Sequence, residues 1–236
     1  MNMIVMLAIF GIIYFVTLLA ICIYREKINI KVGNVIFMIA DLICFSFWTY
    51  SYYQMGGLKE GFLTLGNISP LMFTVIVLLP FMKESVRSYA EATIAFLSVG
   101  MLLAFFISPE HAYLFSFKQE ANLNYTAEAA CHMICSLFGL YLIITKQVEP
   151  NFKGWIRSMI FIYSIITMAV GLNYIYHRDY FGMNPYGNYK IYMIDIFGSF
   201  EATLAAYYFG IMVVLLLGVQ FGRLIYKFTL HEKIEL

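Results

Sequence analysis

The chain of 236 residues is 62% hydrophobic and only 12% charged, and its formal net charge is +1. Soluble domains average about 45–50% apolar and about 25% charged residues, so this composition excludes an ordinary water-soluble domain. The near-neutral charge gives no indication of nucleic acid as a partner. We therefore expect a protein whose apolar surface faces lipid.

The first apolar segment, residues 3–24, is the run MIVMLAIFGIIYFVTLLAICIY. A signal peptide has an apolar core of about 7–15 residues, and positive charge precedes that core. This segment is longer than such a core and has no positive charge before it. We expect it to be a retained membrane span.

Six further segments are long enough to cross a bilayer, because a hydrocarbon core of about 30 Å needs about 20 apolar residues per helix. They lack the alternating pattern of barrel strands, so helices are the remaining way to satisfy every backbone polar group in lipid. The predicted fold is all-α, a polytopic bundle of seven transmembrane helices that forms a single domain over residues 1–236. The predicted spans are residues 3–24, 34–54, 63–82, 89–108, 127–146, 157–176 and 199–222.

Basic residues are distributed unevenly between the two sets of alternating loops and tails. One set carries eleven Lys and Arg, and the other carries four. Because cytoplasmic loops are enriched in Lys and Arg, we expect the N-terminus outside and the C-terminus in the cytoplasm of a cell membrane. The eleven are Arg25, Lys27, Lys31, Lys83, Arg87, Lys146, Lys153, Arg157, Arg223, Lys227 and Lys233, and the four are Lys59, Lys118, Arg178 and Lys190.

The four cysteines, Cys22, Cys44, Cys131 and Cys135, all lie within apolar runs. This placement favours reduced thiols that pack as small apolar side chains over a disulfide framework. Cys131, His132 and Cys135 fall on one helical turn but lack the second Cys/His pair of a zinc site. We expect no metal and no cofactor.

Polar residues inside the predicted spans cluster toward the outer half of the bilayer. Such residues are costly in lipid, so each needs a partner or a function. His132 lies roughly 8 Å below the outer boundary of the fifth span, at a rise of about 1.5 Å per residue. The sequence therefore predicts a polar pocket that is open toward the outer face. Its expected members are His132, Asn67, Ser69, Thr74, Asn173, Tyr174 and Glu201.

Asp41 is the exception, because it lies roughly 12 Å from the cytoplasmic end of the second span, near mid-membrane. Each candidate also has a structural alternative. His132 can be a hydrogen-bond partner between helices. Ser69 and Thr74 can bond to their own backbone. Glu201 can complement the dipole of the last helix.

Several stretches resemble the YwaF-like, transmembrane-protein-164-related integral membrane acyltransferases. They are CHMICSLFGLYLIIT with His132, GLNYIY at residues 171–176, LGNISPLMFTVIVLLPFMKES, FLSVGMLLAFFISP and the loop with Pro185. The resemblance implies acyl transfer onto or from a lipid, with His132 as the base and with Asn173 and Tyr174 as the family's Asn-Tyr pair.

At ISPLMFT the chain has neither the His nor the Cys of the family's Leu-His-Leu-Cys stretch. Nucleophilic catalysis would then need the hydroxyl of Ser69 or Thr74, because nucleophilic catalysis requires a hydroxyl or thiol next to a base. Asn173, Asn67 or a backbone amide freed near Pro70 would stabilise the oxyanion.

Two functions remain open on the sequence alone. The first is a lipid acyltransferase or hydrolase that uses the intramembrane His132. The second is a non-catalytic binding or accessory subunit that keeps the fold without the nucleophile. The expected partners are a membrane lipid and a second membrane protein, and the compact loops and the resemblance suggest a bacterial membrane. A transporter ranks last because the inner half is apolar apart from Asp41, and a rhodopsin is excluded because the seventh span has no lysine.

Overall fold

The computed structural model describes residues 3–54, 68–107, 122–177, 180–182 and 196–231. These residues form only helices, which confirms the all-α prediction. In chain order they are α1 (Met3–Tyr24), α2 (Ile30–Gln54), α3 (Ile68–Leu78), the 3₁₀ turn η3 (Leu79–Phe81), α4 (Glu84–Ile107), α6 (Leu123–Ile144), α7 (Phe152–Tyr176), the 3₁₀ turn η4 (Tyr180–Gly182) and α9 (Phe200–His231).

Five of the described helices, α1, α2, α6, α7 and α9, are long and apolar enough to cross a membrane. Their outward faces carry large apolar side chains, among them Ile12 (66% exposed), Val16 (62%) and Phe209 (62%). Apolar surface of this extent is stable against lipid but not against water. The described chain is therefore a helical membrane protein.

Four helices, α2, α4, α6 and α7, begin four or five residues earlier than the apolar runs predict, and an asparagine precedes three of them. Asn122 Oδ1 accepts a hydrogen bond from Tyr125 N at 2.9 Å, and Asn151 Oδ1 accepts one from Gly154 N at 2.8 Å. Asn29 Oδ1 accepts in the same way from Lys31 N at 3.1 Å. These side chains satisfy amides that have no partner within the helix, so the helices extend into polar sequence.

The third predicted span, residues 63–82, corresponds to α3 and η3, and its residues 63–67 lie outside the described part of the chain. Pro80 is the second residue of η3, which follows α3 directly. Because proline cannot donate the backbone hydrogen bond of a helix interior, α3 ends there. The apolar helical segment Ile68–Phe81 is shorter than the five long helices.

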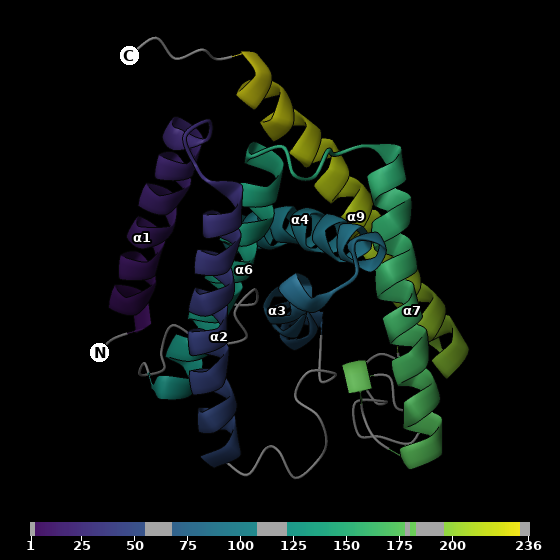
Figure 1. Cartoon of the computed structure of the whole chain (residues 1–236). Coiled ribbons are helices and arrows are strands. Elements are labelled where there is room, and N and C mark those ends of the chain that lie inside the picture. The colour runs from purple at the N-terminus through teal and green to yellow at the C-terminus, as the bar shows by residue number, and fades with distance from the viewer. Residues whose placement is uncertain (1–2, 55–67, 108–121, 178–179, 183–195, 232–236) are drawn as a thin grey trace.

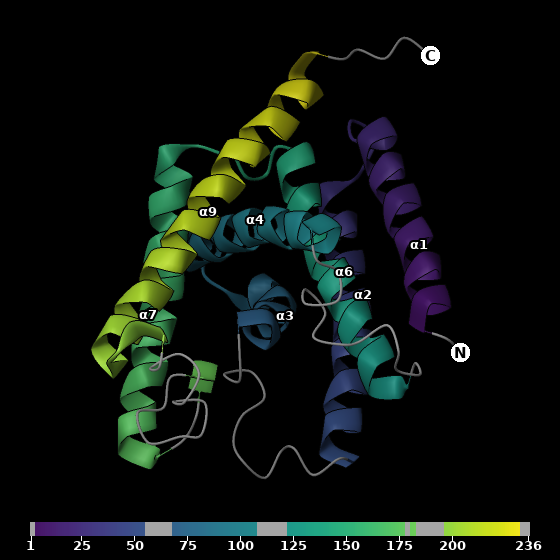
Figure 2. The ribbon, with the colours of Figure 1, turned by 180° about the vertical axis from the view of Figure 1, so that it is seen from behind.

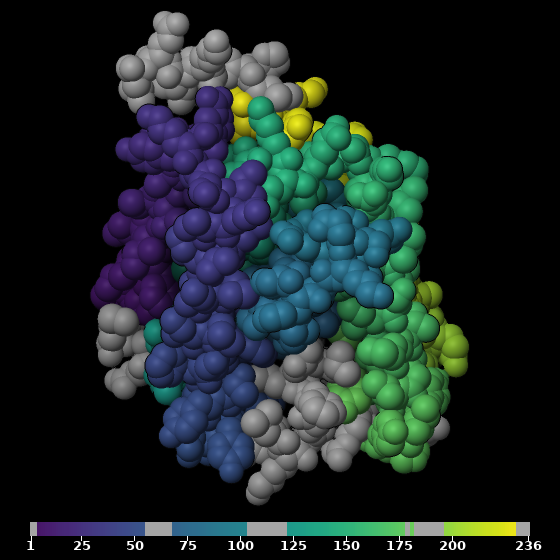
Figure 3. Space-filling view, viewed as in Figure 1, coloured from purple at the N-terminus to yellow at the C-terminus, as the bar shows by residue number. Residues whose placement is uncertain are grey.

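The helices do not all run in the same direction (Figures 1 and 2). α2, α6 and α7 run lengthwise, whereas α4 lies across them and α3 is seen nearly end-on in both views. The α1–α2 turn, the α6–α7 connection and the end of α9 lie at one end of the molecule, and the N-terminus lies away from that end. Figure 3 shows α2 and the α3–α4 segment beside one another on one face.

α4 is the centre of the core, where it packs against α6, α7 and α9. Every residue from Ala90 to Val99 is buried. Glycines on the neighbouring helices permit this close crossing. A Cβ at Gly139 would collide with the Ser98 side chain, and one at Gly218 would lie 2.8 Å from the backbone carbon of Phe96. Small residues at such crossings are typical of membrane helix packing.

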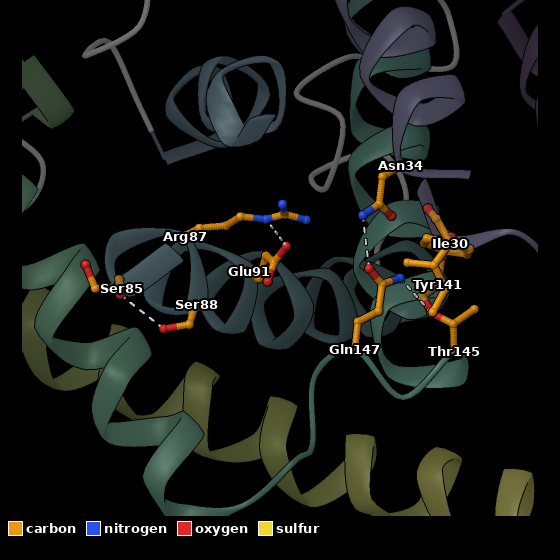
Figure 4. A network of polar contacts seen from close by, with 9 residues as sticks. All are labelled: Ile30, Asn34, Ser85, Arg87, Ser88, Glu91, Tyr141, Thr145 and Gln147. Carbon is orange, nitrogen blue, oxygen red and sulfur yellow. Dashed lines mark hydrogen bonds and ion pairs between the residues drawn. The ribbon is translucent and has the colours of Figure 1, made fainter. Parts of the chain in front are cut away.

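Hydrogen bonds between polar residues stabilise the end of the bundle that carries the α1–α2 turn (Figure 4). Asn34 Nδ2 donates to Gln147 Oε1 at 3.0 Å, and the Tyr141 hydroxyl donates to the carbonyl of Ile30 at 3.2 Å. In the same view Arg87 pairs with Glu91 at 2.7 Å on α4. The first two bonds join the start of α2 to the end of α6, so we assign them a structural role.

Candidate functional site

His132 lies on α6, is 7% exposed, and is held in one orientation by its own helix. Its Nδ1 is 2.8 Å from the carbonyl oxygen of Glu128. A carbonyl oxygen can only accept, so Nδ1 carries the proton of this bond. In the neutral ring the lone pair then belongs to Nε2, which is the nitrogen able to act as a base.

Phe73 of α3 contacts the ring of this histidine. The two rings meet edge to face, with centroids 5.2 Å apart and an angle of 85° between their planes. Phe73 also contacts Phe45 and Trp48 of α2, at 6.0 and 5.8 Å between ring centroids. The site around His132 is therefore built by α2, α3 and α6.

The two predicted nucleophiles on α3 occupy different faces of that helix. Ser69 lies four residues before Phe73, which places it on nearly the same face, the one turned toward His132. Thr74 lies about 100° further round the helix. The Thr74 hydroxyl donates to the carbonyl oxygen of Pro70 at 3.0 Å within the same helix. Helix geometry thus favours Ser69 over Thr74 as the hydroxyl near His132.

Asp41 is buried on α2 with an exposed fraction of 0%. Neither of its carboxyl oxygens has a hydrogen-bond partner within the described residues. Its helix, α2, packs against α6, the helix that carries His132. All four cysteines are free. A group of this kind is costly in an apolar interior and is a common mark of a functional position in membrane helices.

A series of hydrogen bonds that passes through Ser136 of α6 was not predicted from the sequence. The Tyr14 and Ser136 hydroxyls are 2.9 Å apart, Ser136 donates to the carbonyl of Ser98 at 3.3 Å, and Ser98 donates to the carbonyl of Cys135 at 2.9 Å. These bonds connect α1, α4 and α6 through the core. The only signal in the sequence is a serine in the middle of each of two apolar runs.

Asn173 is buried at the end of α7 but does not join the His132 site. Its Nδ2 donates to the carbonyl of Tyr180 at 2.9 Å, and its Oδ1 accepts from the amide of Tyr180 at 2.8 Å. The side chain therefore fixes η4 against α7. In both views α6 and α7 stand on opposite sides of α3 and α4 (Figures 1 and 2), so equal depth along two helices does not make their residues neighbours.

Tyr174 and Glu201, two further predicted members of the pocket, are also placed apart from His132. Tyr174 is 46% exposed, and its ring meets that of Phe200 edge to face at 6.1 Å. Glu201 is exposed in the first turn of α9. Asn67 lies outside the described residues. Of the predicted set, the structure brings His132 against α3 and buries Asp41 on α2, which packs against the helix of His132.

No group of three or more His, Cys, Asp or Glu among the described residues could hold a metal ion. The arrangement instead offers a buried base on α6, a hydroxyl on the facing side of α3 and a carboxyl group on α2.

These features define the class as an α-helical membrane protein with polar groups buried between its helices. The chain matches no family model, no curated protein and no solved structure.

Proposed function

We propose that this protein acts on a membrane lipid as an acyltransferase or hydrolase, with His132 as the general base. The observation that carries the proposal is the bond from Nδ1 of His132 to the Glu128 carbonyl. It fixes the tautomer in which Nε2 can accept a proton, which is the role that a backbone or carboxylate acceptor commonly plays for a catalytic histidine. The resemblance to the transmembrane-protein-164-related acyltransferases points to the same residue.

Ser69 is the proposed nucleophile, with Thr74 as the second choice. The Ser69 hydroxyl attacks the ester carbonyl of the lipid while its proton passes to Nε2 of His132. The bond between the carbonyl carbon and the leaving oxygen breaks, and that oxygen takes the proton from His132. Water or an acceptor alcohol then attacks the acyl-serine by the same route, which releases a fatty acid or a new ester.

The second candidate is a non-catalytic lipid-binding or accessory subunit, with a second membrane protein as its partner. A specific observation favours it: two of the predicted catalytic groups already have structural bonds. Thr74 donates to Pro70, and both ends of the Asn173 amide are used by Tyr180. These bonds hold the helix and the η4 turn, which is a structural role.

The proposed topology is a cell-membrane protein with seven crossings, its N-terminus outside and its C-terminus in the cytoplasm. Two facts support it. The connections at the end of the bundle that holds the α1–α2 turn carry most of the described basic residues, as expected for a cytoplasmic side. α2 ends and α6 begins at the opposite end, so the α3–α4 segment between them accounts for an even number of crossings. The basic residues concerned are Arg25, Lys27, Lys31, Lys146, Lys153, Arg157, Arg223 and Lys227.

The test uses the purified full chain in liposomes of mixed bacterial phospholipids, with the acyl composition followed by mass spectrometry. The key variant is His132→Asn, because an asparagine amide can still donate to the Glu128 carbonyl but offers no base in place of Nε2. Ser69→Ala and Thr74→Ala remove one hydroxyl each. Monodisperse elution and unchanged thermal unfolding establish that each variant is folded.

We expect turnover by the wild type that is lost in His132→Asn and in one of the two hydroxyl variants. The hydroxyl variant that loses activity identifies the nucleophile. Full turnover by His132→Asn would show that the histidine is structural. A wild type that leaves every lipid unchanged would reject the enzyme and favour the accessory subunit.

A further inference from the structure

An apolar cavity of about 300 Å³ lies between α3, α4 and α9. It is separate from the His132 side of α3. Its wall is hydrocarbon apart from the hydroxyl of one tyrosine, Tyr207. The residues that shape it are Ile68, Leu97, Phe197, Tyr207, Gly210 and Val214.

A glycine keeps this cavity open. A Cβ built on Gly210 would have no atom within 4 Å, so a side chain at this position would enter unoccupied space. An apolar cavity does not hold ordered water, because water needs two to four polar partners, and this wall offers a single hydroxyl. The natural occupant is therefore a hydrocarbon.

The cavity opens toward the surface of α9 that faces lipid. Gly210 and Val214 both line the cavity and are exposed, Val214 to 40%. Phe209, the neighbour of Gly210, is 62% exposed. A chain lying among lipids beside α9 can thus reach the cavity sideways without crossing a polar surface.

The size of the cavity agrees with a segment of an acyl chain. A group the size of a water molecule occupies about 30 Å³, so the space accommodates roughly ten groups of that size, close to the number of methylenes in half of a long fatty acid. Burial of each methylene contributes about 0.8 kcal/mol relative to water. The free energy gained relative to a chain already in lipid is smaller. We therefore expect the cavity to select an acyl chain by its shape rather than by high affinity.

We propose that this cavity binds one acyl chain of a membrane lipid, which enters laterally beside α9. The inference rests on the proposed function only in taking a membrane lipid as the ligand. It also places the lipid near the proposed nucleophile: Ile68 lines the cavity, and the next residue is Ser69. A chain held there brings its ester group toward the start of α3.

The experiment uses a phospholipid with a photoreactive diazirine midway along one acyl chain, incorporated in liposomes with the full-length protein. Crosslinked peptides are mapped by mass spectrometry. Gly210→Phe fills the cavity from its wall. Gly171→Phe is the matched control, because a Cβ at Gly171 also meets nothing within 4 Å and Gly171 does not line the cavity.

We expect crosslinks at Leu97 and along the 206–214 stretch in the wild type, which fall about tenfold in Gly210→Phe and stay within about twofold in Gly171→Phe. Equal labelling of these residues in Gly210→Phe and the wild type would overturn the proposal. So would a wild type in which the cavity residues carry no more crosslinks than the outward face of α1. If Gly210→Phe does not give monodisperse protein, Ala206→Leu fills the same space with a smaller change.

His132→Asn separates this proposal from the proposed function. Labelling that persists in this variant while turnover is absent from every form of the protein would leave the acyl-chain site standing and reject the enzyme. Turnover that persists in Gly210→Phe together with unchanged labelling would reject the acyl-chain site and leave the proposed enzyme standing.

Discussion

Gly139 is the point where α4 crosses α6 most closely, and replacing it with alanine is the sharpest test of this packing. A Cβ at this position would collide with the side chain of Ser98 and lie 2.7 Å from the carbonyl oxygen of Ile94. Ordinary contact begins at 3.4 Å, so the backbone of α4 would have to move by at least about 0.7 Å. α4 has little room to do so, because the stretch from Ala90 to Val99 is buried against three helices.

The magnitude follows from three opposing effects. Overpacking of a filled core costs about 1–3 kcal/mol. Displacement of Ser98 weakens its bond to the Cys135 carbonyl, which contributes about 1 kcal/mol. Alanine returns about 0.5–1 kcal/mol because it is a better helix former than glycine. We expect Gly139→Ala to lower the free energy of unfolding by about 1–3 kcal/mol, or Tm by about 2–10 °C in a chain of this size.

The assay is thermal unfolding in detergent, followed with a maleimide dye that fluoresces when it reacts with thiols. Cys131 and Cys135 are 0% exposed, so the dye reports the opening of the helix bundle around them. Gly171→Ala is the control, since its Cβ would meet nothing, and its Tm should be unchanged or slightly higher. Equal Tm values for Gly139→Ala and Gly171→Ala would refute the close crossing of α4 and α6.

Three further predictions use the same assay or a simple fusion. Asn173→Ala should lower the free energy of unfolding by about 1–3 kcal/mol, because it leaves the buried backbone of Tyr180 without its two bonds; an unchanged Tm would show that Asn173 does not fix η4. Asp41→Asn should leave stability unchanged or raise it by about 1–2 kcal/mol, because the carboxyl group has no partner to lose; a clear loss would reveal an ionic partner. A green fluorescent protein fused to the C-terminus should fluoresce and alkaline phosphatase should be inactive there, and the opposite pattern would invert the proposed topology.

The helices of this fold could be predicted from the sequence because lipid imposes a length on every apolar run. The first segment is predicted and found at residues 3–24. The starts of α2, α4, α6 and α7 were predicted too late, because the apolar pattern begins after the helix does, and α9 continues past its predicted end. At α2, α6 and α7 an asparagine directly before the helix supplies the cap, and this signal was available in the sequence.

The candidate site was less predictable, because a sequence gives depth along a helix but not which helix stands beside it. His132 and Asn173 were expected at similar depth, yet one contacts α3 through Phe73 and the other closes on Tyr180. The burial of Asp41 depends on the pairing of α2 with α6, which no local pattern encodes. Only the chemistry of the residues, not their neighbours, could be anticipated.

Hydropathy could not predict how α3 and α4 are oriented relative to the bilayer. An apolar run has the same composition whether it crosses a bilayer or lies buried within the bundle. The described part of α3 has 11 residues, a rise of about 16 Å, which is short of the bilayer core. α4 lies across α6 and α7 (Figure 1) and owes its apolar character to burial among helices as much as to lipid.

The depth of the α3–α4 turn therefore decides the number of crossings. Ser85 is exposed at the start of α4, and Ser85→Cys gives this turn a reactive thiol. Seven crossings place the turn on the cytoplasmic side, so a membrane-impermeant maleimide should label Cys at this position in inside-out vesicles and not in intact cells. The wild type is the control for background labelling of the native cysteines. Labelling in intact cells would contradict the orientation. Protection on both sides would place the turn within the membrane. The crossings would then number five, because α3 and α4 would enter and leave from the outer side.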